Sequence, residues 1–325
     1  MNPGLRTFLG QIAATALLGC LPLAASAQAE YPRKPIRFVL GVSPGGLIDV
    51  SARLIASNLS TRLGQQVIVE NKPGAATTIA ANEVLRAAPD GYTFFYGGAM
   101  SASPIFLKHG AVDFVAQTKP VSQTLFAPFY LMVSSKVPAN TIQELAAYSK
   151  KNPGKLNLAD ISPVTTMVMH AIAEQSGLDF TPIPYKGSAP ALTALIGGEV
   201  DLVLDTVPNY VQHIKAGKMR ALMNTGRSRM VVLPDVPTGL ETKLIDFSTG
   251  SVFGVWAPPG TPDTIIKRLS DEIAAIAKDP VYAAKFRDAT QVDPLGTSPA
   301  ELLKVIDADR ALYSRVAKRT GFQPQ

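Results

Sequence analysis

Cysteine is almost absent from the sequence: among its 325 residues only Cys20 carries a thiol. Cys20 lies in an N-terminal segment that we expect to be removed, so the mature chain would have no cysteine. That absence excludes disulfide bonds, a catalytic cysteine and a cysteine-based zinc site. Histidine is also scarce, and His109, His170 and His213 show no spacing typical of metal ligands. We therefore expect neither a metal ion nor another cofactor.

Long hydrophobic runs are missing after residue 24, because no later segment approaches the ~18 uninterrupted apolar residues of a membrane span. Near the N-terminus, Arg6 precedes an apolar stretch at residues 12–24, and residues 25–27 (ASA) resemble a signal-peptidase site. This pattern predicts a signal peptide at residues 1–27 and an exported, soluble product. Residues 17–20 (LLGC) also resemble a lipobox, so a lipid anchor on Cys20 is the alternative.

Charge is not concentrated in any part of the chain. There are 31 Lys and Arg residues against 25 Asp and Glu, which gives a formal net charge of +6. The densest basic stretch, residues 215–229, is interrupted by apolar residues, and no basic arm or aromatic-interleaved patch is present. This distribution favours a solvated basic surface and argues against nucleic-acid binding. It is compatible with mild steering of anionic solutes.

What the sequence does contain is a regular alternation of strand-like and helix-like segments, which is typical of parallel sheets with crossover helices. The expected strands fall at residues 36–40, 67–69, 92–96, 129–133, 156–158, 181–183, 200–204 and 252–256. After the last of them the chain becomes mainly helical. Its final helix opens with Ser298 and Glu301 in a capping-box pattern.

These segments form two successive βαβ arrays, which predicts an α/β fold with two lobes. If the helical tail packs back on one array, the chain crosses between the lobes near residues 126–133 and again near residues 251–256. The predicted fold is two βαβ domains joined by two crossover strands, with a ligand cleft between them. The expected domains are residues 28–128 plus 252–325 for domain 1, and residues 129–251 for domain 2.

Residues 41–49 (GVSPGGLID) connect the first strand to a predicted amphipathic helix. In that helix Ile48, Ala52, Ile55 and Leu59 recur at steps of three or four, so one face is buried. In an open α/β sheet, ligands bind beyond the carboxyl ends of the strands. Glycines there allow N–H groups at a helix start to approach an anion closely. The sequence therefore predicts an anion site in this loop.

The same loop matches the G-x-S-x-G pattern of serine hydrolases, with Ser43 as the nucleophile. The residue after the nucleophile must donate its backbone N–H to the oxyanion hole, but here that residue is Pro44, which has no N–H. A hydrolase would also need one of the three histidines within hydrogen-bond reach of Ser43. Hydrolysis is thus the disfavoured alternative.

Short motifs are spread over nearly the whole mature chain. They are residues 31–37 (YPRKPIR), 44–46 (PGG, with Asp49), 63–65 (LGQ), 69–74 (VENKPG), 89–93 (PDGYT), 184–192 (PYKGSAPAL), 197–201 (GGEVD), 233–238 (LPDVPT) and 257–262 (APPGTP). In this order and spacing the chain resembles the exported solute-binding proteins of tripartite tricarboxylate transporters, the Bug-type family. The resemblance implies a two-lobed periplasmic binding protein fold, type II-like, that closes on a small carboxylate. It also implies the membrane subunits of such a transporter as partners.

The resemblance places the ligand between two loops at helix starts, one in each lobe. The loop of domain 1 contains Gly45 and Gly46. The loop of domain 2 contains Tyr185, Lys186, Gly187 and Ser188. Each helix start offers N–H donors without intrahelical partners and a partial positive charge. Two such ends suit a dicarboxylate, and the backbone of the second loop is the expected contact, since Lys186 can point to solvent.

The chain departs from the family in three loops, one of which is residues 74–78 (GAATT) in place of a run richer in glycine. Residues 41–46 (GVSPGG) replace the common PFPPGG, so an aromatic wall is missing and Ser43 adds a hydroxyl; we expect a ligand of different shape. Residues 160–163 (DISP) replace a loop rich in glycine and serine, which places Asp160 and Ser162 near the cleft. Asp160 either pairs with an ammonium group of the ligand or turns outward to solvent.

Four more side chains are candidates with two readings each. Thr77 and Thr78 either offer hydroxyls to the ligand or cap the following helix. Asp49, in the first turn of its helix, either satisfies backbone donors there or contacts an amine or water of the ligand. Asp205, at the end of a strand, either lines the cleft or holds the neighbouring loop in place.

The leading hypothesis is a periplasmic protein, without catalysis, that captures a carboxylate and delivers it to a transporter. The ligand class includes mono- and dicarboxylates, aromatic acids and amino acids. An exported sensor for the same kind of ligand is the alternative. A monomer is expected, because the cleft must open and close.

Overall fold

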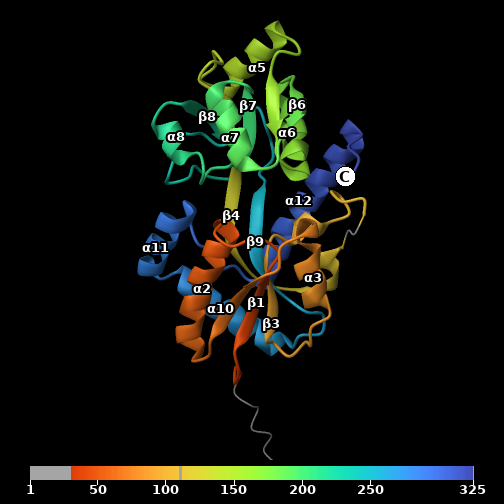
Figure 1. Ribbon diagram of the computed structural model, residues 1–325, viewed down its shortest axis with the longest axis vertical. Coiled ribbons are helices and arrows are strands. Elements are labelled where there is room, and N and C mark those ends of the chain that lie inside the picture. Colours follow the sequence, from red (N-terminus) through yellow and green to blue (C-terminus); the bar gives the residue numbers. More distant parts are fainter. Residues whose placement is uncertain (1–30, 110–111, 325) are drawn as a thin grey trace, which may run out of the picture.

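The computed structural model describes residues 31–109 and 112–324, which fold into two lobes (Figure 1). The predicted signal peptide and Cys20 lie outside the described residues. We call lobe 1 the part built around strand β1 (Ile36–Leu40), and lobe 2 the part built around strand β5 (Asn157–Asp160). Lobe 1 is the lower and lobe 2 the upper part of Figure 1.

The sheet of lobe 1 begins with three parallel strands and ends with two antiparallel ones. β1 lies between β2 (Val67–Asn71) and β3 (Thr93–Gly97), and it pairs in parallel with both. β9 (Gly250–Ala257) then pairs antiparallel with β3 and with the first part of β4 (Lys119–Ser134). β1 is almost entirely buried, which agrees with the apolar runs of strands covered on both faces.

The sheet of lobe 2 has the same kind of core. β5 lies between β6 (Thr181–Pro184) and β7 (Leu202–Thr206), parallel to both. The second part of β4 pairs antiparallel with β7 on one side and with β8 (Met219–Asn224) on the other. Each lobe is thus an α/β unit, as the alternating segments predict.

Helices pack around both sheets (Figure 1). Those of lobe 1 are α2 (Leu47–Leu63), α3 (Thr78–Leu85), α4 (Phe114–Gln117), α10 (Asp263–Ala277) and α11 (Pro280–Thr290), with the 3₁₀ turns η2 (Ala75–Thr77) and η3 (Ala99–Ala102). Those of lobe 2 are α5 (Ile142–Lys151), α6 (Pro163–Ser176), α7 (Ser188–Gly197), α8 (Val211–Lys215) and α9 (Gly239–Thr242). The buried face of α2 contains Ala52, Ile55 and Leu59, so the predicted helical periodicity is confirmed.

Strand β4 runs through both lobes. The sequence predicts only its second part, but the strand is 16 residues long and starts at Lys119. Its partner changes from β9 at Pro128 to β7 at Phe129. β9 lies beside it at close range, since a Cβ on Gly254 would come within 2.7 Å of the Ser122 carbonyl oxygen. We call this paired region of β4 and β9 the hinge. The predicted domain boundaries stay a prediction.

The last helix, α12 (Pro299–Thr320), contacts both lobes. Leu302 and Ile306 belong to a buried cluster of lobe 1, whereas Tyr313 and Val316 belong to the main buried cluster of lobe 2. Its 22 residues extend about 33 Å at 1.5 Å per residue, which is long enough to reach across both. The expectation that the helical tail packs on one array holds for α10 and α11, whose buried residues belong to a cluster of lobe 1, but it is wrong for α12.

The start of α12 has the predicted capping box. The Ser298 hydroxyl accepts a hydrogen bond from the Glu301 N–H at 3.3 Å, and the Glu301 carboxylate accepts one from the Ser298 N–H at 2.8 Å. These two bonds satisfy donors that the helix itself leaves without partners. Within the described residues, none of the helices has the length and apolar character needed to cross a membrane.

We expect Ile306→Ala to lower the free energy of unfolding by about 2–5 kcal/mol, because the fully buried side chain leaves a cavity beside the sheet of lobe 1. Urea denaturation measures this loss. The control is Lys304→Ala on the exposed side of the same helix, which should change stability by less than about 0.5 kcal/mol. Equal effects of the two substitutions would contradict the packing of α12.

Candidate functional site

The loop between β1 and α2 ends in an open helix start. Gly45 has φ +92°, a conformation that favours glycine, and Gly46 is the N-cap of α2. A Cβ added at Gly46 would meet nothing within 4 Å, so the space in front of this residue is open. The N–H groups of the first turn have no intrahelical partners. Gly46 and the residues after it can therefore present N–H donors to a bound group.

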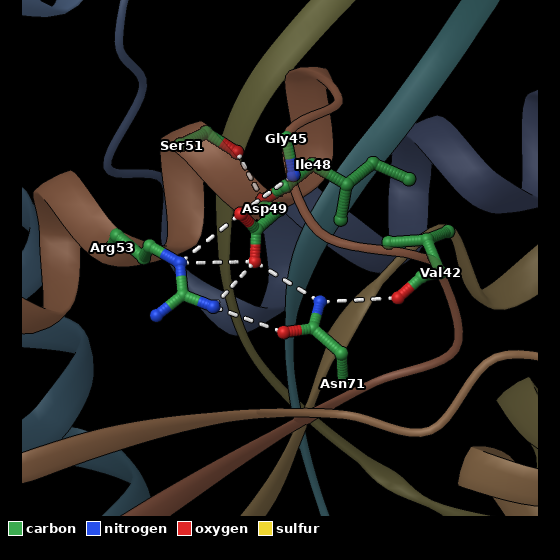
Figure 2. Close-up of polar contacts among 7 residues, drawn as sticks. All are labelled: Val42, Gly45, Ile48, Asp49, Ser51, Arg53 and Asn71. Carbon is green, nitrogen blue, oxygen red and sulfur yellow. Dashed lines mark hydrogen bonds and ion pairs between the residues drawn. The ribbon is translucent and has the colours of Figure 1, made fainter.

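A buried carboxylate holds this loop in shape (Figure 2). Asp49 is only 3% exposed, and its Oδ2 accepts a hydrogen bond from the Gly45 N–H at 2.9 Å. Its Oδ1 accepts one from Arg53 Nη2 at 2.9 Å and one from Asn71 Nδ2 at 3.0 Å. The N–H of Gly45 is thus directed at Asp49, and both oxygens of the carboxylate are used within the protein.

Asn71 connects the end of β2 to the same cluster. Its Nδ2 also donates to the Val42 carbonyl oxygen at 3.0 Å, and its Oδ1 accepts from Arg53 Nη2 at 2.9 Å. Burial acts to raise the pKa of Asp49, but hydrogen bonds from Arg53, Gly45 and Asn71 outweigh it, so the pKa is lowered. The carboxylate is held ionised and bound to protein donors, which fits the loop-holding reading of Asp49.

The loop after β2 packs against the start of the β1–α2 loop. A Cβ on Gly41 would lie 2.5 Å from the Cβ of Thr77, so glycine is needed there. Thr77 is the N-cap of α3 with φ +72°, an uncommon value for a β-branched residue, and its hydroxyl makes no capping hydrogen bond. The Thr78 hydroxyl instead donates to the Ala75 carbonyl oxygen at 2.7 Å. Of the two hydroxyls, that of Thr78 is already engaged.

The second loop, between β6 and α7, is built in a similar way. Gly187 is the N-cap of α7 with φ +96°, and a Cβ there would meet nothing within 4 Å. Ser188 is the first residue of the helix, and Lys186 is exposed. Tyr185 is partly buried and packs against a second buried cluster of lobe 2, which includes Leu195 and Val203. Its N–H donates to the Asp160 carbonyl oxygen at 2.8 Å.

A buried carboxylate lies beside this loop as well. Asp205 is 7% exposed and accepts hydrogen bonds from the Tyr210 hydroxyl at 2.9 Å and the Thr206 N–H at 2.7 Å. The Tyr210 hydroxyl also lies 3.4 Å from the Ser188 carbonyl oxygen. Burial raises the pKa of Asp205, although hydrogen bonds from Ser188 and Tyr210 oppose the shift. Asp205 therefore ties the end of β7 to the start of α7.

Asp160 and Ser162 are engaged at the start of α6. The Asp160 carboxylate, half-buried, accepts a hydrogen bond from the Thr166 hydroxyl. Ser162 is the N-cap of α6, and its hydroxyl accepts from the Thr165 N–H at 3.2 Å. Asp160 is the last residue of β5, and neither of its two predicted roles, a counter-ion for the ligand or a solvated side chain, includes this bond to α6.

Ser43 is exposed, and within residues 31–109 and 112–324 no hydrogen bond joins it to His109, His170 or His213. The same part of the chain has no group of three His, Asp or Glu side chains that could hold a metal ion. The predicted residues thus lie at or beside the starts of four helices, α2 and α3 in lobe 1 and α6 and α7 in lobe 2, and the carboxylates of Asp49, Asp160 and Asp205 accept hydrogen bonds from protein donors.

Sequence reasoning missed Arg53, Asn71 and Tyr210, which complete the two clusters. A signal existed for two of them. Arg53 follows Asp49 by four residues on one helix, a spacing that brings opposite charges together. Asn71 lies inside the VENKPG motif, which we used only for the family resemblance. Tyr210 has no comparable local signal.

A sequence model described as the tripartite tricarboxylate transporter family receptor, TctC, matches residues 51–322. The chain belongs to this family. A relative of this receptor from Cupriavidus necator, described as a UPF0065 protein in the gbd 5' region, is 38% identical over 287 residues. The match covers 85% of this chain and 86% of the relative.

Two solved structures extend the comparison. Rpa4515 of R. palustris, determined with adipate, is 30% identical with a TM-score of 0.77, covering 91% of this chain and 100% of that chain. MatC from Rhodopseudomonas palustris, with bound malate, is 28% identical with a TM-score of 0.71, covering 88% of this chain and 100% of that chain. Periplasmic binding proteins are among the matching structures. The predicted family and two-lobed fold of the receptor are confirmed.

We expect Asp49→Asn to lower the free energy of unfolding at pH 7 by about 1–3 kcal/mol, because three protein donors lose a buried carboxylate. Since the pKa of Asp49 is lowered in the folded state, its contribution is present above the unfolded pKa and is lost as the pH falls through the folded value. Urea denaturation at pH 7 and at about pH 3 should therefore show a smaller difference from wild type in acid. The exposed Asp288→Asn is the control, and a loss as large as that of Asp49→Asn would contradict this role.

The pH dependence of Asp205→Asn should have the opposite sign. Because burial raises the pKa of Asp205, its neutral form is favoured and wild-type stability is lost as the pH rises through the folded pKa. The asparagine cannot ionise, so the variant should gain stability relative to wild type over the range from about pH 4, the ordinary pKa of aspartate in an unfolded chain, to neutral pH. Thermal unfolding over that range measures the trend, and a relative loss at higher pH would show that the ionised carboxylate is the stabilising form.

Proposed function

We propose that this receptor captures a small dicarboxylate between its lobes and delivers it to the membrane subunits of a tripartite tricarboxylate transporter. The observation that carries the proposal is the pair of open glycine N-caps, Gly46 of α2 in lobe 1 and Gly187 of α7 in lobe 2. Two similar proteins hold adipate and malate, both dicarboxylates. The role is binding without catalysis and needs no cofactor.

Each helix start can receive one carboxylate group. N–H groups of the first turn lack intrahelical partners, and the helix dipole adds about 0.3–1 kcal/mol of attraction for a negative charge. Hydrogen bonds to a charged group contribute about 1.5–3 kcal/mol each. Because the donors belong to two lobes, a ligand with a carboxylate at each end would hold the lobes together. This geometry favours a dicarboxylate over a monocarboxylate.

In this proposal the residues of the two loops have different roles. Gly46, Gly187 and Ser188 present backbone N–H groups to the ligand, and the hydroxyls of Ser43 and Thr77 add polar contacts. Asp49 and Asp205 act as positioning residues, since their carboxylates accept hydrogen bonds from the protein. Gly45, Tyr185 and Lys186 shape or flank the loops, and Thr78, Asp160 and Ser162 hold adjacent helix starts.

The wider assignment follows from the same function. We propose export through a signal peptide at residues 1–27 and a periplasmic location, as suits a family of transporter receptors. We propose a monomer with domain 1 at residues 28–128 plus 252–325 and domain 2 at residues 129–251. The change of partner along β4 between Pro128 and Phe129 supports the first of these boundaries.

The test is calorimetric titration with adipate and malate, with glutarate and hexanoate as probes of chain length and of the second carboxylate. Gly46→Leu should weaken dicarboxylate binding at least tenfold, because its side chain enters the open space at the α2 start while φ −82° allows any residue. The control is Gly197→Leu at the last turn of α7, which should bind as wild type does.

Hexanoate, with the chain length of adipate and one carboxylate, should bind more weakly than adipate by a similar factor. If adipate and hexanoate bind equally well, or if Gly46→Leu binds adipate as tightly as wild type does, the ligand is not held by one carboxylate at each helix start, and the proposal is wrong.

A further inference from the structure

A cavity of about 230 Å³ lies at the hinge, next to helix α12. Its walls come from both lobes and from α12: Phe126 on β4, Met230 after β8, and Val305 and Asp309 on α12. None of the residues that we assign to the dicarboxylate site contributes to its lining. The cavity is therefore separate from the two helix starts.

Asp309 is the most unusual group in this cavity. Its residue is 5% exposed, and its Oδ1 accepts a hydrogen bond from the Thr249 hydroxyl at 2.9 Å. The Tyr313 hydroxyl lies 2.9 Å from the same Thr249 oxygen, so Asp309 belongs to a short chain of polar groups beside the start of β9. In the described part of the chain, no hydrogen bond is made by Oδ2. Asp309 lines this cavity and also a smaller neighbouring one of about 60 Å³, so its second carboxylate oxygen can accept a donor from a ligand bound beside it.

Two further polar side chains of the lining complement Asp309. Gln123 is 3% exposed and lies on the wall that β4 contributes. Arg227 is exposed and also contributes to the lining. Phe126, Leu295 and Val305 supply apolar walls. The lining thus combines a buried acid, an exposed cation and apolar side chains.

We propose that this hinge cavity is a second binding site, which takes a small apolar amino acid as a zwitterion. Its ammonium group would donate to Asp309 Oδ2, its carboxylate would pair with Arg227, and its side chain would lie against Phe126 and Val305. The carboxylate of Asp309 attracts a positively charged group, but Arg227 repels a ligand that is only positive. A zwitterion fits because its ammonium group can pair with Asp309 while its carboxylate pairs with Arg227. The site does not depend on the proposed dicarboxylate function.

The pH dependence of this site follows from its charged groups. Burial raises the pKa of Asp309 to about 7, although the hydrogen bond from Thr249 acts to lower it. The Tyr313 hydroxyl is linked to it through Thr249, Arg227 lines the same cavity, and the neighbouring Arg310 pairs with Asp113. An ammonium group binds the ionised carboxylate. Amino acid affinity should therefore fall as the pH drops from about 8 to 6.

The experiment uses leucine and its two single-charge analogues as probes. Isoamylamine lacks the carboxylate, and 4-methylpentanoate lacks the amine. Calorimetric titration of the full mature receptor should show leucine binding at least tenfold tighter than either analogue, because each analogue loses a charge-assisted contact. Saturating adipate should not displace leucine from the receptor, since the two ligands occupy different sites.

Two variants separate the charged ends. Asp309→Asn should weaken leucine at least tenfold and abolish its pH dependence, with the exposed Asp307→Asn on the same helix as control. Arg227→Gln should bring leucine to the affinity of isoamylamine while it leaves adipate binding unchanged, with the exposed Arg33→Gln as control. Arg227 lies at the surface, so this variant keeps the test valid even if the buried substitution destabilises the fold.

Three results would overturn the hinge site. Wild type does not bind leucine, both Asp309→Asn and Arg227→Gln bind it as wild type does, or adipate displaces it. Loss of adipate binding by wild type would instead remove the proposed function and leave the hinge site intact. The two proposals therefore fail separately.

Discussion

The proposed dicarboxylate site depends on one constraint: backbone N–H groups at two helix starts must be held open, without partners, in two different lobes. Open donors require loops of unusual conformation, and the receptor holds each loop with a buried aspartate. Asp49 accepts hydrogen bonds from Gly45, Arg53 and Asn71, and Asp205 accepts them from Tyr210 and Thr206. Since both carboxylates are engaged by the protein, they repel an anion less than free carboxylates would.

Three elements, β4, β9 and α12, connect the two lobes. β4 and β9 pass side by side through the hinge, and α12 packs against buried clusters of both lobes. Any relative movement of the lobes must therefore shift α12 along at least one of them. On α12, Asp309 accepts a hydrogen bond from Thr249, the residue before β9, and it also lines the hinge cavity.

Much of the fold could be predicted from the sequence because its signals are local. The spacing of Ala52, Ile55 and Leu59 predicts the buried face of α2, and the capping pattern at Ser298 predicts the start of α12. The motif order predicts the family, which the TctC match confirms. The glycine loops could be located as well, since only glycine adopts the φ values of Gly45 and Gly187 freely.

By itself, then, the sequence determined the alternating α/β elements, the family and the two helix starts that define the candidate site. Only the tertiary structure decided where polar groups point, because their partners lie far away along the chain. Asn71 reaches Asp49 from another element, and Thr249 meets Asp309 across 60 positions. The full length of β4 could not be predicted either. Pro120 and Pro128 lie within it, and proline is disfavoured inside a strand, but pairing with the neighbouring strands stabilises β4. Contacts between distant segments carry no local pattern, and they set both the shape of the loops and the position of α12 across the lobes.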